Sequence, residues 1–213
     1  PTAESRQVVV KIPAKHDSKE ALGLLGREIA PMSTGGVVGM TGSFGAGRAS
    51  PTPVIRMFSC LVPKTQVPVI IEMDGRQIPM QEGARSGGFT AQQLPVEAPP
   101  APSKAAGATE TVPLVALAYG RSGDKGDNAN IGIFARQPEY VPILESEVTE
   151  EAVAAYFAHR ISGDTRGKVT RWRLPGIGGF NFLLREALGG GGMASLKADP
   201  LAKAFAQMLL DMP

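Results

Sequence analysis

The sequence predicts an α+β protein made of two structured parts, and three observations indicate this. Strand candidates rich in Val and Ile alternate with amphipathic helix candidates in both parts. A segment poor in large apolar side chains, residues 79–111, separates them. The length of 213 residues accommodates two domains of about 100 residues each. The predicted structured parts are therefore residues 1–78 and 112–213.

The first part is predicted to fold as a small β-α-β-β segment. Asp17 and Glu20 have the spacing of a capping box, and Pro31 is expected to end the helix that follows. Asp74 and Gly75 form a turn signal after the last strand. The predicted elements are a strand at 7–12, a helix from Asp17, a glycine-rich loop at 35–47, and strands at 54–62 and 67–73.

The segment 79–111 is predicted to be a linker. It contains five Pro, four Gly and seven Ala among its residues. Such a composition cannot bury enough apolar surface to offset the entropy lost on ordering.

The second part is predicted to form a small sandwich, with helices covering one face of a four-stranded sheet. Thr149 is a suitable N-cap for one helix, and Asp199 with Pro200 indicates the start of the last one. The predicted elements are strands at 112–119 and 130–136, a helix from 149, a strand at 168–174, a short helix at 181–188, a short strand at 193–197 and a helix from 199.

Composition excludes several classes of function. The 22 basic and 20 acidic side chains give a net charge of +2, too balanced for a broad nucleic-acid-binding surface. No apolar run approaches the roughly 18–20 residues of a membrane span. The one cysteine, Cys60, excludes an intramolecular disulfide framework, and with two histidines the chain offers little for a zinc site. We therefore expect no nucleic-acid partner, no membrane partner, no metal site and a reducing, cytoplasmic setting.

Residues 42–50 partly imitate a phosphate-binding loop. That loop requires Lys followed by Ser or Thr, then a helix. Here Arg48 and Ala49 occupy those two positions, and Pro51 follows shortly after. A plain glycine loop, or one that covers a substrate, is the favoured interpretation.

The polar segment 121–131 is the main candidate site. Asp124 and Asp127 are candidate proton-transfer groups, and Lys125 is a candidate for stabilising an oxyanion. The alternative is a hairpin loop whose Asp and Asn side chains cap their own backbone, and residue types alone leave the two readings open. The candidate binding residues are Arg121, Ser122, Gly123, Gly126, Asn128 and Asn130.

Two glycine-rich turns in the second part add further candidates. The turn at 175–179 leads to Asn181, and the four glycines 189–192 include Gly190 and Gly191. Backbone amides in such turns can receive an anionic group, although a plain helix cap is the simpler reading. The pair of arginines around Trp172 would suit stacking on RNA, but alternate strand residues face opposite sides of a sheet.

The second part resembles the C-terminal ferredoxin-like domain of the acyclic terpene utilisation (AtuA) family. The resemblance rests on the string Ser-Gly-Asp-Lys-Gly-Asp at 122–127 with Asn130-Ile-Gly132, on Leu174-Pro175 with Asn181-Phe182, and on 187–192 with Asp199-Pro200. The first part resembles, less closely, the end of the family's larger α/β core. The resemblance thus implies an α+β fold with a ferredoxin-like sandwich at 112–213.

The resemblance also implies a function. Family members are bacterial cytoplasmic proteins encoded with enzymes of acyl-CoA carboxylation and β-oxidation. We accordingly expect an acid/base step on a branched acyl-CoA thioester, with no other cofactor. The alternative is a noncatalytic oligomerisation or docking module of such an assembly. Family members are longer, so the chain is expected to be part of a larger protein, with an AtuA-like core domain or chain as partner and a homo- or hetero-oligomeric state.

Overall fold

The structure, a computed structural model, describes residues 5–40, 50–80, 110–174 and 176–213. The predicted linker at 79–111, apart from two residues at each end, lies outside these residues. Most of the predicted glycine loop at 35–47 and nearly all of 42–50 also lie outside them. Two compact units divide the chain, residues 57–103 in one and residues 1–56 with 104–213 in the other.

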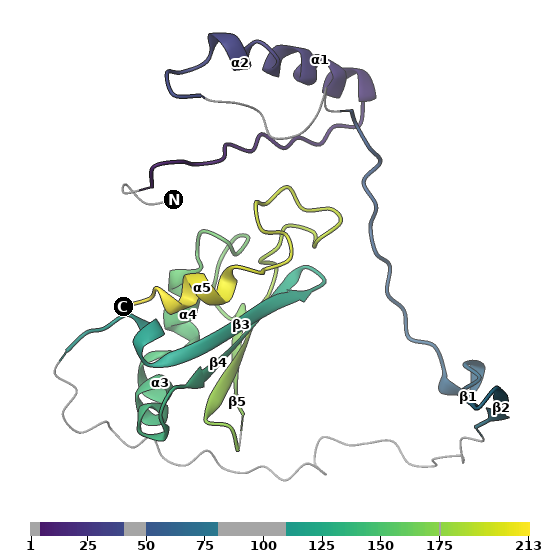
Figure 1. The fold of residues 1–213 in the computed structure, drawn as a ribbon, viewed down its shortest axis with the longest axis vertical. Coiled ribbons are helices and arrows are strands. Elements are labelled where there is room, and N and C mark those ends of the chain that lie inside the picture. Colours follow the sequence, from purple (N-terminus) through teal and green to yellow (C-terminus); the bar gives the residue numbers. More distant parts are fainter. Residues whose placement is uncertain (1–4, 41–49, 81–109, 175) are drawn as a thin grey trace. The chain divides into compact units, whose positions relative to one another are not determined.

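Helix α1 (Lys19–Ile29) confirms the helix predicted in the first part, but its cap differs from the prediction (Figure 1). The N-cap is Ser18, whose hydroxyl accepts a hydrogen bond from the Ala21 amide at 3.2 Å. Ser18 Oγ also donates to the Glu20 carboxylate at 2.8 Å, which lowers the pKa of that carboxyl. The predicted Asp17 cap is therefore wrong by one residue, because serine is an equally good cap. A short helix, α2 (Met32–Gly35), follows with Pro31 as its N-cap.

The strands predicted at 7–12 and 54–62 are wrong, since neither segment pairs with a described strand. The strand predicted at 67–73 is confirmed in part by β1 (Ile70–Met73), which follows the 3-10 turn η1 (Lys64–Gln66). It forms a hairpin with β2 (Arg76–Pro79), a strand that was not predicted. Its turn is at the predicted Asp74 and Gly75, with positive φ angles of 52° and 72°. A strand is stable only when its backbone N–H and C=O groups are paired with another strand. The alternating apolar pattern of 54–62 does not by itself provide a pairing strand.

The second part contains the predicted four-stranded sheet. Its strands are β3 (Ala118–Lys125), β4 (Asn128–Ala135), β5 (Val169–Leu174) and β6 (Gly179–Leu184) (Figure 1). The spatial order is β3-β4-β6-β5, and every neighbouring pair is antiparallel. Helices α3 (Val141–Glu147) and α4 (Glu150–Tyr156) lie in the crossover between β4 and β5, and α5 (Phe205–Leu210) follows β6. The mixed α+β class is therefore confirmed.

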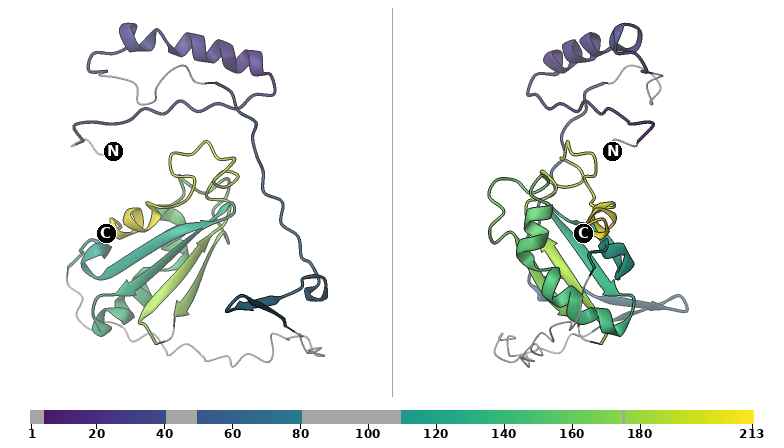
Figure 2. Two further views of the ribbon diagram at one scale, coloured as in Figure 1. Left: turned by 45° about the vertical axis from the view of Figure 1, so that its right-hand side comes forward. Right: turned by 90° about the vertical axis from the view of Figure 1, so that its left-hand side faces the viewer.

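One face of this sheet, the covered face, packs against the helices (Figure 2). It presents the buried side chains Ile131, Ile133, Phe180, Phe182 and Leu184. The rings of Phe157, after α4, and Phe205, in α5, lie 5.2 Å apart over the same core. Apolar burial on this face supplies the main stabilisation of the domain.

The opposite face, the open face, carries the alternate residues of the same strands. It presents Tyr119 and Arg121 from β3, Asn130 and Phe134 from β4, Asn181 from β6 and Trp172 from β5. Tyr119, Arg121 and Trp172 are exposed. Asn130, Phe134 and Asn181 are half-buried. No described helix packs on this face.

Several predicted elements of the second part are corrected. The segment predicted as a short helix at 181–188 is strand β6 and its continuation, because Phe180, Phe182 and Leu184 repeat every second residue. The strand predicted at 193–197 is a turn, in which the Ala194 and Ser195 amides donate to the Gly191 carbonyl. The segment predicted as a strand at 112–119 contains the 3-10 turn η3 (Leu114–Ala116), and only Ala118 and Tyr119 belong to β3.

Both predicted helix starts in this part are tested by the structure. Thr149 caps α4 as predicted, since its hydroxyl accepts from the Ala152 amide at 3.1 Å. Asp199 accepts from the Lys203 and Ala204 amides at 2.9 and 2.8 Å, but α5 begins only at Phe205. Ala202 has a positive φ of 51°, which interrupts a regular helix at that point.

Candidate functional site

The polar segment predicted as a loop at 121–131 is a β-hairpin. Strand β3 continues to Lys125, strand β4 starts at Asn128, and only Gly126 and Asp127 form the turn. Gly126 has a φ of 66°, the positive value that a two-residue hairpin turn requires. The loop prediction is wrong because polar side chains are tolerated on β3, which is an edge strand of the sheet.

Strand alternation divides the predicted site residues among three places. The turn holds Gly126 and Asp127, and the covered face holds Ser122 and Asp124 at its edge. The open face holds Arg121, Gly123, Lys125, Asn128, Asn130 and Asn181. These residues therefore do not form one cluster, and their catalytic and binding roles stay a prediction.

The hairpin turn is fastened to the glycine turn 189–192. The carboxylate of Asp127 accepts a hydrogen bond from the Gly190 amide at 2.6 Å, and its carbonyl accepts from the Leu188 amide at 3.1 Å. A Cβ atom at Gly191 would lie 2.7 Å from the carbonyl oxygen of Gly126. The predicted residues Gly126, Asp127, Gly190 and Gly191 thus come together, and glycine at 191 permits the close approach.

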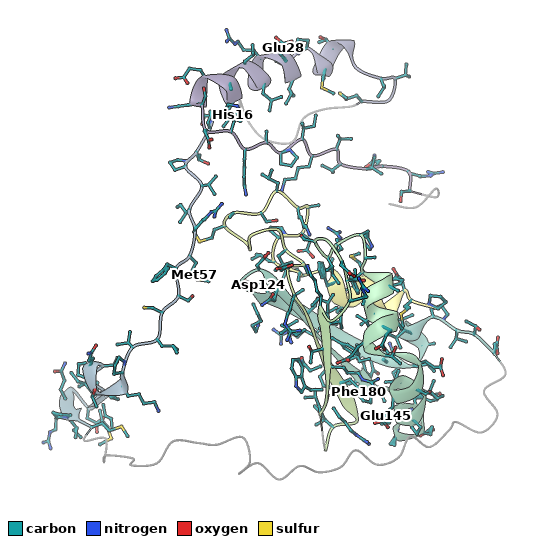
Figure 3. All side chains as sticks on the ribbon, turned by 180° about the vertical axis from the view of Figure 1, so that it is seen from behind. His16, Glu28, Met57, Asp124, Glu145 and Phe180 are labelled. Carbon is teal, nitrogen blue, oxygen red and sulfur yellow. The ribbon has the colours of Figure 1, made fainter. Side chains whose placement is uncertain are left out.

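The covered-face members contact helix α5 and its approach. Ser122 Oγ accepts from the Ala206 amide at 2.8 Å, near the start of α5. Asp124 lies near the hairpin end of the sheet, away from Phe180 and Glu145 (Figure 3). Its carboxylate faces the Lys203 ammonium at 3.8 Å, and both side chains are partly exposed. Lys203 is a site candidate that the sequence did not reveal, because nothing in its local pattern marks it as a neighbour of Asp124.

The open-face members form a separate polar group. The Asn130 amide donates to the Asn181 carbonyl oxygen at 2.8 Å and to the Phe182 backbone carbonyl at 3.3 Å. Asn128 Oδ1 accepts from the Glu186 amide at 3.1 Å. Arg121 is exposed, and its guanidinium has no hydrogen-bond or ion-pair partner among the described residues.

The three residues Arg171, Trp172 and Arg173 do not act as one unit. Arg171 lies on the covered face, where its guanidinium donates to the backbone carbonyls of Glu145 and Val148. Arg173 pairs with Glu145 at 3.3 Å on the same side. Trp172 alone points to the open face, as the alternation rule predicts.

The chain matches two models of known protein families. The family described as "Acyclic terpene utilisation family protein AtuA" matches residues 1–73, and the "AtuA ferredoxin-like domain" matches residues 112–213. The chain belongs to the AtuA family. The antiparallel sheet with its helices on one face is thus the ferredoxin-like domain of AtuA, and the predicted resemblance is confirmed. No curated protein and no solved structure matches the chain.

The AtuA ferredoxin-like domain also holds a lysine with a perturbed pKa near the hairpin turn. The Lys197 ammonium donates to the Ala187 carbonyl at 2.8 Å and to the Arg160 carbonyl. Partial burial lowers the pKa of Lys197, the charge of Arg160 lowers it further, and Asp127 raises it. Both bonds are to backbone carbonyls, so Lys197 connects the 187–197 turn to the turn that follows α4.

Two further features of this AtuA chain bear on its chemistry. Among the described residues, no group of three or more His, Cys, Asp and Glu side chains is arranged to hold a metal ion. No helix in the described part of the chain is both long and apolar enough to span a bilayer.

Proposed function

We propose that this AtuA-family chain acts in the bacterial catabolism of acyclic terpenes or related branched acids, and that residues 112–213 serve there as a noncatalytic binding and docking module of an acyl-CoA-processing assembly. The observation that carries this proposal is the internal engagement of the hairpin. Asp127, Asn128 and Ser122 each accept a hydrogen bond from a backbone amide of a later segment. Side chains that are bonded to the backbone of the same domain fix the shape of its surface, which favours a docking role.

The partner proposed for the chain is an AtuA-like core domain or chain. None of the described residues from 5 to 80 is buried, although many of them are large and apolar. Phe58 and Leu61, for example, are 88% and 101% exposed. Apolar surface of this extent favours association with a complementary core. The exposed thiol of Cys60 supports a reducing, cytoplasmic setting for that assembly.

The oligomeric state tests the docking role. We expect the full chain to form a homo- or hetero-oligomer in size-exclusion chromatography with light scattering, and Asp127→Ala to weaken that assembly while acyl-CoA binding persists. Asp164→Ala is the matched control, because the exposed Asp164 carboxylate is bonded to Arg166, two residues along the chain, and not to the glycine turn. An assembly unchanged in Asp127→Ala, together with lost acyl-CoA binding, would contradict the docking role.

A second candidate is the acid/base step on an acyl-CoA thioester, and the pair of Asp124 and Lys203 favours it. The Asp124 side chain is 38% exposed, and its only ion pair among the described residues is the 3.8 Å contact with Lys203. A carboxylate that is accessible beside an ammonium can accept a proton while the cation stabilises an oxyanion. Lys125 is directed to the opposite face of the sheet, and its ammonium donates to the Asp124 backbone carbonyl at 2.8 Å, so Lys203 is the cation of this pair.

Single substitutions separate the two candidates. If the acid/base step occurs here, Asp124→Asn should lower turnover of a branched acyl-CoA by the assembled AtuA protein at least about 100-fold, whereas Asp127→Asn should act through stability alone. Equal turnover in Asp124→Asn and the wild type would remove this candidate and leave the docking module.

A further inference from the structure

The open face of the sheet has an unusual charge composition. Four cations belong to it, Arg121 and Lys125 on β3, Arg136 just after β4 and Arg185 just after β6. Within the four described strands, no residue directed to this face carries a carboxylate. The covered face and the hairpin turn, by contrast, hold Asp124 and Asp127. The open face therefore favours an anionic ligand.

The centre of the open face is a row of aligned residues. Strand pairing places Arg121, Gly132, Asn181 and Trp172 side by side on β3, β4, β6 and β5. Three strand spacings of roughly 4.8 Å put the Cα atoms at the two ends of the row about 14 Å apart. The row has a cation at one end and an aromatic ring at the other, and between them the Phe134 ring lies next to Gly132, which has no side chain.

Of the aromatic rings on the open face, Trp172 is the one available for stacking. The guanidinium of Arg136 lies 3.9 Å from the centre of the Tyr119 ring and covers one side of it. Phe134 lies against the sheet, because Cβ atoms at Gly132 and Gly179 would meet its ring at 3.7 and 2.8 Å. Trp172 is 45% exposed, and no described ring or cation stacks on it. A single free ring suits one base, whereas an oligonucleotide platform requires several.

Polar groups next to Trp172 can recognise the edge of a base. Asn130 donates to the Asn181 oxygen at 2.8 Å, which leaves the Asn181 amide nitrogen and the Asn130 oxygen without an internal partner among the described residues. One donor and one acceptor side by side match the hydrogen-bonding edge of a purine.

We propose that the open face binds a nucleotide with more than one phosphate, with its base on Trp172 and Asn181 and its phosphates on Arg121 and Arg185. Coenzyme A carries such a nucleotide, and choosing it as the source rests on the proposed acyl-CoA function. The geometry itself requires only an aromatic base and phosphate charge.

The experiment uses the fluorescence of Trp172, which is the only tryptophan of the chain. We expect coenzyme A and ADP each to quench it saturably in the full-length chain, and pantetheine, which lacks the nucleotide, to leave it unchanged. Arg121→Gln and Arg185→Gln should each weaken ADP binding at least about fivefold, since each removes a charge-assisted hydrogen bond. Rising salt should weaken binding of both nucleotides.

Arg166→Gln provides the matched control. Arg166 is 91% exposed and pairs with Asp164 in the 162–168 segment, so the same loss of charge occurs away from the open face. Its ADP affinity should equal that of the wild type. Trp172→Ala, followed by calorimetry in place of fluorescence, should abolish binding, and Trp172→Phe should restore part of it.

Three results would overturn the inference. These are no saturable quenching by either nucleotide, unchanged affinity in both arginine variants, and quenching by single-stranded RNA without quenching by ADP, which would make the face a nucleic-acid platform. If the chain binds ADP as expected but takes part in neither acyl-CoA turnover nor assembly, the inference is supported and the proposed function is contradicted.

Discussion

Asp127 holds two turns together through its carboxylate and its backbone carbonyl. Its side chain accepts the Gly190 amide at 2.6 Å while its carbonyl accepts the Leu188 amide. We expect Asp127→Ala to lower the free energy of unfolding by about 1–2 kcal/mol, because the Gly190 amide loses its partner. Urea titration followed by circular dichroism measures this. Asp164→Ala also removes an acceptor of a backbone amide, but from a local contact in an exposed turn, and should shift the midpoint less. An equal shift in both variants would contradict a specific role for Asp127.

Lys197 gives the fold a dependence on alkaline pH. Its pKa is lowered from the ordinary 10.5, first by burial and then by Arg160. The folded chain thus holds this proton less tightly than the unfolded chain, and stability contributed by Lys197 rises with pH in the window below 10.5. The effect is small, because the side chain is only partly buried.

Lys197→Met should remove that rise. The variant is expected to be less stable at every pH, since the carbonyls of Ala187 and Arg160 lose a donor. The informative quantity is the difference in melting temperature between wild type and variant, followed from pH 7 toward pH 10. This difference should widen as the pH rises, and a constant difference would show that the lysine titrates normally in the folded chain.

Arg171 connects three elements at the scale of strands and helices. Its guanidinium donates to the Glu145 and Val148 carbonyls at 2.9 and 2.8 Å, and its backbone amide donates to the Glu150 carboxylate at 2.6 Å. Strand β5 is thereby joined to the α3–α4 junction. Arg171→Met should destabilise the domain by about 2–3 kcal/mol and reduce hydrogen-exchange protection in α3 and α4.

Arg173→Gln is the control for that prediction. Arg173 lies on the same face of the same strand and pairs with Glu145 at 3.3 Å, but the arginine is exposed. Exposed ion pairs of this kind contribute about 0–1 kcal/mol. If Arg173→Gln costs as much as Arg171→Met, the backbone contacts of Arg171 are not what holds the junction.

The elements that could be predicted are those whose signals are local. The Thr149 cap, the turn at Asp74 and Gly75, and strand β5 each follow from a few adjacent residues. Strand β6 was mistaken for a helix, because its short apolar run satisfies both periods and only pairing with β4 and β5 decides between them.

The candidate site was predictable only where its sequence signals are local. Clustered polar residues marked the hairpin, and the glycine run marked its neighbour, yet their contact through Asp127 and Gly190 depends on tertiary structure. The division of 121–131 between two faces required knowing that the segment is a strand, since a loop has no fixed alternation. The positions of Lys203 and Arg185 could not be predicted, because no local sequence pattern indicates which residues they contact.

Burial is confined to one part of the described chain. Every buried residue of the described ranges lies between Leu114 and Leu210. We therefore expect hydrogen exchange by mass spectrometry to show slow amides in β4, β6 and α5 and fast amides throughout 5–80 in the isolated chain. Slow exchange in α1 without any partner would contradict this expectation, and slowing on addition of the proposed core partner would support the docking role.

The strand order β3-β4-β6-β5 has a kinetic consequence. Two of its pairings are hairpins between strands adjacent in the sequence, whereas β4–β6 joins strands separated by α3, α4 and β5. Closing that seam carries the larger loop entropy, so the hairpins should form early and their union should limit the rate of folding. A chevron analysis of Ile133→Val and Val169→Ala tests this order. Because the early hairpins and the seam are both formed at the rate-limiting step, both variants are expected to slow refolding. A Val169→Ala variant that chiefly accelerates unfolding would contradict early formation of the β5–β6 hairpin.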